Sequence, residues 1–127
     1  MYAWNHAEGH WDAVYQIGNV PKPKFHSTLA ELPGTRTAYL FGGNSEEPVS
    51  SDFYKLDLET LSWTFLGYAP IPPRFAAGMV GVNGMIYIGF GNNAFGVVIS
   101  DMWRYDPSTS QWTQISTAGN SILLKFN

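Results

Sequence analysis

Residues 51–57 read SDFYKLD and residues 100–106 read SDMWRYD, and a Trp-Thr pair follows each stretch, at 63–64 and 112–113. The register is constant, because Asp52 and Asp101, and likewise Trp63 and Trp112, are separated by 49 positions. A period near 50 residues is typical of propeller blades and similar arrays of one supersecondary unit. The sequence therefore predicts two copies of one structural unit.

Short β-branched and aromatic runs between turn residues predict four strands in each copy. The runs cover 25–32, 36–41, 53–57 and 63–66 in the first copy, and 75–82, 85–90, 102–106 and 112–115 in the second. Asn83-Gly84 predicts a two-residue hairpin turn, which needs positive φ at both positions. Further strands are expected at 11–17 and 122–126, and no segment has the apolar period of a helix. We expect an all-β chain of two four-stranded antiparallel sheets with extra terminal strands.

Composition excludes several classes of partner. The chain is 13% charged and 16% aromatic, with a net charge of -3, and its seven Lys and Arg are scattered, which disfavours nucleic acid. The longest apolar run, 85–90, is too short to span a membrane. Cys is absent, which excludes disulfides and thiolate chemistry, and the first residues lack the pattern of a secretory signal. We expect a cytoplasmic protein without a cofactor.

The repeated residues, taken in order, resemble the kelch repeat family of β-propellers. The likeness extends from about residue 24 to residue 116. The features that carry it are the diglycine Gly42-Gly43 after a strand, the strand end Tyr105-Asp106-Pro107, and the following Trp63 and Trp112. The resemblance implies that Tyr39, Tyr87, Trp63 and Trp112 are core residues that supply buried area between blades.

Each copy departs from the family pattern at one place. The first has Leu56 where the second has Tyr105, and the second has Phe90-Gly91 where the first has the diglycine. Because Phe lacks the backbone freedom of Gly, we expect Gly91 or Asn92 to adopt the unusual dihedral at this strand exit.

The resemblance also implies a domain organisation. Blades are expected at 25–67 and 68–117, after an N-terminal segment, 1–24, with a strand that completes a neighbouring blade, and before a C-terminal strand or tail, 118–127. Known propellers have four to eight blades, so two blades do not close a ring. Either identical chains assemble, three giving six blades or two giving four, or the blades belong to a longer kelch protein or rest on another kelch chain.

Two function classes follow from the resemblance. The first is a non-catalytic binding or scaffolding module for a protein or carbohydrate ligand, and the alternative is a fragment or subunit of a kelch-type sugar-processing enzyme. The copper oxidase similar to galactose oxidase uses a Cys-modified Tyr, which a chain without Cys lacks in that form. No nucleophile motif is present, so no catalytic residue is predicted.

Candidate binding residues lie in the two long loops that join the second and third strands of each copy, because long loops on rigid scaffolds commonly bind. The first loop is acidic and the second is apolar. Residues 95–99 of the second either form a contact surface or pack against the adjacent blade. The predicted loop residues are Asn44, Glu46, Glu47, Asn92, Asn93, Phe95 and Val98.

Charged residues outside these loops give two further candidates. Arg74 and Lys24 occupy matching positions, where they either line an anion-receptive channel or form structural ion pairs, the use that we favour. His6, Glu8, His10 and Asp12 alternate, so an extended segment would place them on one face. That face either binds a divalent metal or is simply solvated.

Overall fold

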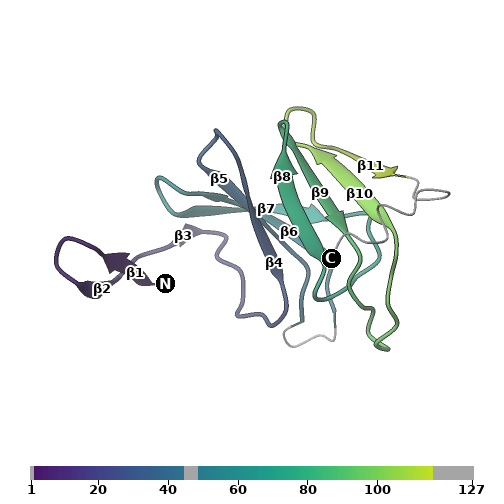
Figure 1. The fold of residues 1–127 in the computed structure, drawn as a ribbon, viewed down its shortest axis with the longest axis horizontal. Helices are drawn as coiled ribbons and strands as arrows, with labels where there is room; N and C mark the ends of the chain where they lie inside the picture. Colours follow the sequence, from purple (N-terminus) through teal and green to yellow (C-terminus); the bar gives the residue numbers. More distant parts are fainter. Residues whose placement is uncertain (1, 45–48, 116–127) are drawn as a thin grey trace.

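The computed structural model describes residues 2–44 and 49–115 as strands, turns and loops arranged in three sheets (Figure 1). The predicted all-β class is confirmed. Among the described residues, no helix has the length and apolar character needed to cross a membrane.

Two sheets correspond to the two repeats, and each contains an antiparallel meander of four consecutive strands, to which sheet 1 adds a fifth, parallel strand. Sheet 1 contains β4 (Thr28–Leu32), β5 (Thr37–Phe41), β6 (Asp52–Asp57) and β7 (Ser62–Tyr68). Sheet 2 contains β8 (Gly78–Val82), β9 (Met85–Gly89), β10 (Met102–Asp106) and β11 (Gln111–Ile115). The strands β4 and β8 lie side by side where the sheets meet (Figure 1). The eight strands predicted in the repeats are therefore present.

The turns have the backbone that their residues require. Asn83 and Gly84 have φ of 52° and 76°, which confirms the predicted tight hairpin between β8 and β9. The Asp that ends the third strand of each repeat holds the next turn: Asp57 Oδ1 accepts from the amides of Glu59 and Thr60, and Asp106 Oδ1 accepts from the amide of Ser108. The repeated Asp is therefore a turn residue.

The first strand of each repeat is shorter than predicted. Residues 25–27 and 75–77 lie outside β4 and β8, because His26 and Ala76 have φ of 54° and 56°. A residue in the left-handed region interrupts the alternation of a strand. Phe25 and Phe75 instead form isolated bridges with Asn44 and Asn92.

The N-terminal segment differs from the single strand predicted at 11–17. Its residues are divided between β2 (His10–Ala13), which pairs with β1 (Tyr2–Asn5), and β3 (Ile17–Gly18), which pairs parallel to β7. Figure 1 shows the β1–β2 hairpin to one side of the two larger sheets. The bounds predicted for that strand are therefore wrong, and the strand predicted at 122–126 lies outside the described residues.

The main core lies between the two sheets. Phe53 of β6 stacks on Tyr39 of β5 with ring centroids 5.4 Å apart, and it meets Tyr105 and Trp112 of sheet 2 edge-on at 4.9 Å each. Ile86 and Ile88 of β9 are fully buried there. Burial, followed by the influence of Tyr105, raises the pKa of Tyr39 to about 12, so this ring stays neutral.

Each sheet has two faces, which we call forward and rear, and the forward face of sheet 1 meets the rear face of sheet 2. The forward face of sheet 1 carries Tyr39 and Phe53 and packs on the rear face of sheet 2, which carries Ile86, Ile88 and Tyr105. The rear face of sheet 1 carries a second cluster of Ala38, Leu56 and Trp63. Because side chains alternate along a strand, Tyr87 lies on the forward face of sheet 2, between Ile86 and Ile88. Tyr39 and Trp63 are buried, whereas Tyr87 and Trp112 are partly exposed.

Candidate functional site

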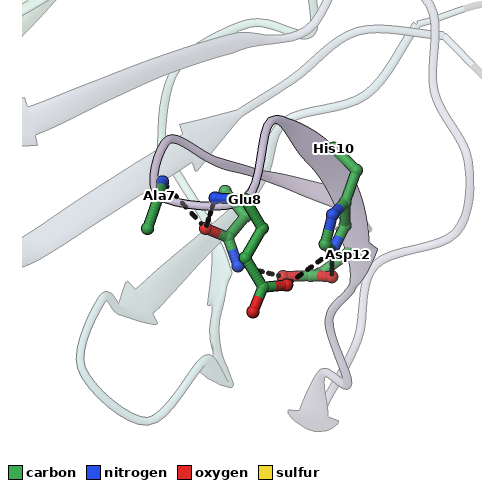
Figure 2. Close-up of polar contacts among 5 residues, drawn as sticks. Ala7, Glu8, His10 and Asp12 are labelled. Carbon is green, nitrogen blue, oxygen red and sulfur yellow. Dashed lines mark hydrogen bonds and ion pairs between the residues drawn. The ribbon is translucent and has the colours of Figure 1, made fainter.

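The N-terminal hairpin brings three of its four alternating charged residues together. Figure 2 shows the carboxylates of Glu8 and Asp12 directed at the ring of His10, whose Nε2 lies 3.3 Å from Glu8 Oε2 and 2.8 Å from Asp12 Oδ1. His6 instead lies edge-on to Trp4. Within residues 2–44 and 49–115, no group of three or more such side chains is arranged to hold a metal ion.

Arg74 is completely buried and its guanidinium is engaged on several sides. It makes a two-pronged ion pair with Asp101, with Nη1 directed at Oδ1 and Nη2 2.8 Å from Oδ2. Nε donates to the carbonyl of Pro72 at 3.0 Å, and Nη1 donates to the carbonyl of Phe90 at 3.1 Å. The structural ion pair that the sequence favoured for this cation is therefore present, and it lies within one repeat.

The carboxylate partner of Arg74 is held in its charged form. Burial alone would raise the pKa of Asp101, but hydrogen bonds from Arg74 and Trp103, together with the charge of Arg74, bring it below the ordinary value of 3.8. The Trp103 indole donates to Oδ2 at 3.0 Å. A charged pair with satisfied hydrogen bonds is how a protein accommodates a buried guanidinium.

The first repeat has a Lys version of the same pair. Lys24 Nζ lies 2.6 Å from Asp52 Oδ2, and the two side chains are 8% and 11% exposed. Ser50 Oγ also donates to this carboxylate. Both repeats therefore join the segment before their first strand to the start of their third strand through an ion pair.

Gly42, the first residue of the diglycine, is required because the backbone of the second repeat lies too close for a side chain. A Cβ on Gly42 would lie 2.8 Å from the carbonyl oxygen of Arg74, and Gly42 and Gly43 have φ of 65° and 92°. The amide of Gly43 donates to that same carbonyl oxygen at 3.1 Å. The diglycine therefore lets the backbone of the second repeat approach the exit of β5.

At the equivalent exit in the second repeat, Phe90 itself adopts φ of 62°, and Gly91 adopts 89°. The expectation that Gly91 takes an unusual dihedral is confirmed, whereas Asn92 does not have positive φ in the structure. A positive φ costs roughly 1 kcal/mol or more for a residue with a Cβ. Phe90 therefore carries backbone strain that Gly42 avoids.

The loop between β9 and β10 displays apolar side chains from a tightly bonded frame. Asn93 Oδ1 accepts from the backbone amides of Phe95 and Val97 at 2.9 and 3.0 Å. The backbone amide of Asn93 donates to the carbonyl of Val97. Phe95 is 89% exposed and Val98 is 75% exposed. These side chains extend from the loop rather than packing on sheet 1.

The other predicted loop residues serve the backbone or lie outside the described residues. Asn44 and Asn92 exchange backbone hydrogen bonds with Phe25 and Phe75. Asn44 Oδ1 is buried and has no hydrogen-bond partner among the residues that the structure places. Glu46 and Glu47 lie outside the described residues. Asn44 and Asn92 therefore hold the backbone at the start of each repeat.

A groove of about 490 Å³ lies between the N-terminal segment and the rear face of sheet 1. Its wall includes Trp63, whose indole donates to Gln16 Oε1 at 2.7 Å, and Lys24, which is already paired. The remaining lining residues are Val20, Pro21, Lys22, Pro23, Ser27, Leu29 and Leu40. Among the described residues, this lining contains two Lys side chains and no carboxylate or imidazole.

The forward face of sheet 2 carries exposed apolar residues that the sequence did not single out, beside Arg104, which pairs with Tyr87 in the register. Val80 and Val82 of β8 are 38% and 42% exposed, and Tyr87 of β9 faces Val80 in the strand register. They occupy the positions of Ala30, Leu32 and Tyr39, which belong to the forward face of sheet 1. The alignment of the two repeats could have identified this face, because it assigns equivalent residues to equivalent faces.

Comparison with known proteins agrees with this architecture. Residues 1–123 match a family model described as the KLHDC2/KLHL20/DRC7 Kelch-repeats domain. The chain is 29% identical over 125 residues to acyl-CoA-binding domain-containing protein 5 of Arabidopsis thaliana, covering 90% of this chain and 19% of that protein. It is 29% identical over 121 residues to kelch repeat-containing protein 2 of Saccharomyces cerevisiae, covering 87% and 14%.

A third relative is protein ral2 of Schizosaccharomyces pombe, 31% identical over 109 residues, covering 76% of this chain and 17% of that protein. The chain thus spans less than a fifth of the length of these relatives. The family model, in contrast, covers almost all of it, including both repeats and the segment before them. This chain belongs to the kelch-repeat family.

Proposed function

We propose that this chain is a non-catalytic kelch module that binds protein partners and assembles with other copies of itself to complete a β-propeller. Kelch domains generally mediate protein–protein interaction. The observation that supports assembly is the exposure of Val80 and Val82 on the forward face of sheet 2. The observation that supports partner binding is the exposed loop between β9 and β10.

The argument for assembly starts from repeat equivalence. Tyr39 on the forward face of sheet 1 is 4% exposed and Leu32 is also 4% exposed, because sheet 2 covers them. Tyr87 and Val82 occupy the same positions on sheet 2 and remain more exposed. A blade packed on this face would remove their apolar surface from water, at roughly 25 cal/mol per Å².

The complementary surface is the rear face of sheet 1. Leu56 and Trp63 on this face occupy the positions of Tyr105 and Trp112, which receive the forward face of sheet 1 within the chain. Because Leu56 and Trp63 are only 3% and 7% exposed, the apolar surface left for a second copy is that of Leu29 and Phe65, which are 57% and 39% exposed. A second copy can therefore contribute its rear face to the forward face of the first. Such head-to-tail contacts form a ring when the rotation closes, and three chains of two blades give six blades.

The test of assembly is the mass of the full chain in solution. We expect sedimentation equilibrium to give a multiple of the chain mass across the micromolar range. Val82→Glu should shift the protein to monomer, because an unpaired carboxylate at an apolar contact is costly to bury. Val97→Glu, at an exposed loop position, is the matched control and should leave the mass unchanged. A wild-type monomer at every concentration would overturn the assembly proposal.

Partner binding is proposed for the tip of the β9–β10 loop. Asn93 Oδ1 accepts from the backbone amides of Phe95 and Val97 and so fixes the loop that displays Phe95 and Val98, and an exposed aromatic side chain is a common anchor at protein interfaces. Carbohydrate is the alternative ligand.

The ligand test compares Phe95→Ser/Val98→Ser with Ala94→Ser, an exposed control in the same loop. Pull-downs with the purified chain should lose the same specific proteins only with the double variant. Binding of wild-type protein to a glycan array, with no protein lost by the double variant, would contradict a protein ligand.

A further inference from the structure

The outer edges of the two sheets differ. In sheet 1, the edge strand β7 is covered by β3, which pairs with it in the parallel direction. In sheet 2, β11 is the last strand of the described sheet, and its outer edge has no paired strand within residues 2–44 and 49–115. An uncovered edge presents backbone amides and carbonyls that accept another strand.

The segment on β7 is bound by a compact set of hydrogen bonds. The amides of Ile17 and Asn19 donate to the carbonyls of Leu61 and Trp63 at 3.1 and 3.0 Å. Asn19 Oδ1 accepts from the amide of Phe65 at 3.2 Å. With the Gln16–Trp63 side-chain bond described above, four hydrogen bonds connect this segment to the edge strand.

The register shows that β11 presents the same groups as β7. Leu56 pairs with Trp63 in sheet 1, and Tyr105 pairs with Trp112 in sheet 2. The residues before these strands also match, since Leu61 and Ser110 have φ of 58° and 59°. The groups equivalent to those that bind β3 are therefore the carbonyls of Ser110 and Trp112 and the amide of Gln114.

Gly18 explains which segments fit such an edge. A Cβ at this position would lie 2.3 Å from the carbonyl oxygen of Trp63, and its φ is 83°. A residue with a side chain is therefore excluded where the segment crosses the Trp. The flanking Ile17 and Asn19 supply the amides, and Asn19 adds its side-chain acceptor. The pattern that fits is Gln, an apolar residue, Gly and Asn.

We infer that the outer edge of β11 is a strand-addition site for an extended segment of a partner protein, which runs parallel to β11 and carries this Gln-apolar-Gly-Asn pattern. The sequence QIGN occurs once in the chain, at 16–19, where it is engaged on β7. Because this segment is engaged on β7, a second segment is needed at β11, and the proposal assigns it to a partner protein. This site uses a sheet edge, and it is independent of the sheet faces that the proposed assembly uses.

The test adds a synthetic peptide of residues 14–20, VYQIGNV, to the ¹⁵N-labelled full chain and follows amide shifts. We expect saturable shifts at residues 110–115. N-methylation at the position of Ile17 removes an edge-directed donor and should weaken binding about tenfold. N-methylation at Gly18 is the matched control, because alternate amides point away from the edge. Gly18→Val in the peptide should abolish binding.

A protein variant locates the site independently. Gln114→Pro removes the outward amide of β11, and Pro is tolerated at such edge positions, so the variant should stay folded and lose the peptide. Val82→Glu should retain the peptide even if it changes the mass in solution. The inference is overturned by the absence of saturable shifts, by shifts at 61–65 from displacement of β3, or by equal weakening with both N-methyl peptides.

Discussion

Sheet 1 and sheet 2 contain the same four-stranded meander, but their surroundings differ. Sheet 1 has a forward face covered by sheet 2, a rear face partly covered by the N-terminal segment, and an outer edge covered by β3. Sheet 2 has a covered rear face, whereas its forward face and the edge of β11 are open among the described residues. The comparison shows that the repeat signature specifies a blade, and that its neighbours determine which equivalent positions become core.

The largest difference between the repeats is expected at their ion pairs. Asp101→Ala leaves the fully buried Arg74 without its carboxylate, and breaking such a pair costs about 3–5 kcal/mol. Asp52→Ala should cost less, because Lys24 keeps a slightly exposed, flexible ammonium group. Urea unfolding of both variants measures the difference. An equal or larger loss for Asp52→Ala would show that the two-pronged geometry is unimportant.

The equivalent tyrosines test the difference between covered and open faces. Tyr39→Ala should reduce the free energy of unfolding by about 3 kcal/mol, because the ring is packed between Phe53 and Tyr105. In the monomeric chain, Tyr87→Ala should reduce the free energy of unfolding by less than half of that amount. Thermal unfolding at low protein concentration measures both values. Similar losses would mean that the forward face of sheet 2 is already as well packed as that of sheet 1.

Substitutions at the two strand exits should change the free energy of unfolding by different amounts. Gly42→Ala combines a positive φ with a contact of 2.8 Å to the backbone of Arg74, and we expect a loss of about 2 kcal/mol. Phe90→Gly relieves the strain at φ 62° but removes a partly buried ring, so its effect should lie within about 1 kcal/mol of zero. Chemical denaturation compares them. A loss at Phe90→Gly as large as at Gly42→Ala would contradict the assignment of strain.

The smallest expected effect is on how the free energy of unfolding depends on pH in the acid range. The pKa of Asp101 is lower in the folded chain than its ordinary value of 3.8, so the folded state binds fewer protons in this range. Its contribution to stability is complete above that ordinary value and is lost as the pH falls through the lower folded pKa. Asp101→Asn should therefore flatten the decline of stability below about pH 4. An unchanged acid profile would contradict this linkage.

The strands of both repeats could be predicted because alternating apolar residues and turn signals are local properties. Asn83-Gly84 specifies its turn by itself, and the repeated Asp57 and Asp106 mark the ends of equivalent strands. The faces follow from the same register. These parts of the fold therefore depend on information within each repeat.

The remainder depends on contacts between distant segments. Residues 11–17 have the composition of a strand, but the available pairing partners divide them between β2 and β3. Phe90 adopts positive φ itself, although residue propensity assigned this to its neighbours. The loop with Phe95 was recognised as apolar, but only the hydrogen bonds of Asn93 show that it is displayed outward.

The placement of the ion pairs also has a consequence for folding kinetics. Lys24–Asp52 and Arg74–Asp101 each close a loop within one repeat, and every strand pair of the two meanders is local in sequence. Short loop closures precede longer ones, so each repeat should form as a separate unit. The Gln16–Trp63 contact joins residues 47 apart and requires an existing β7. We therefore expect β3 to add in a late step, after sheet 1 has formed.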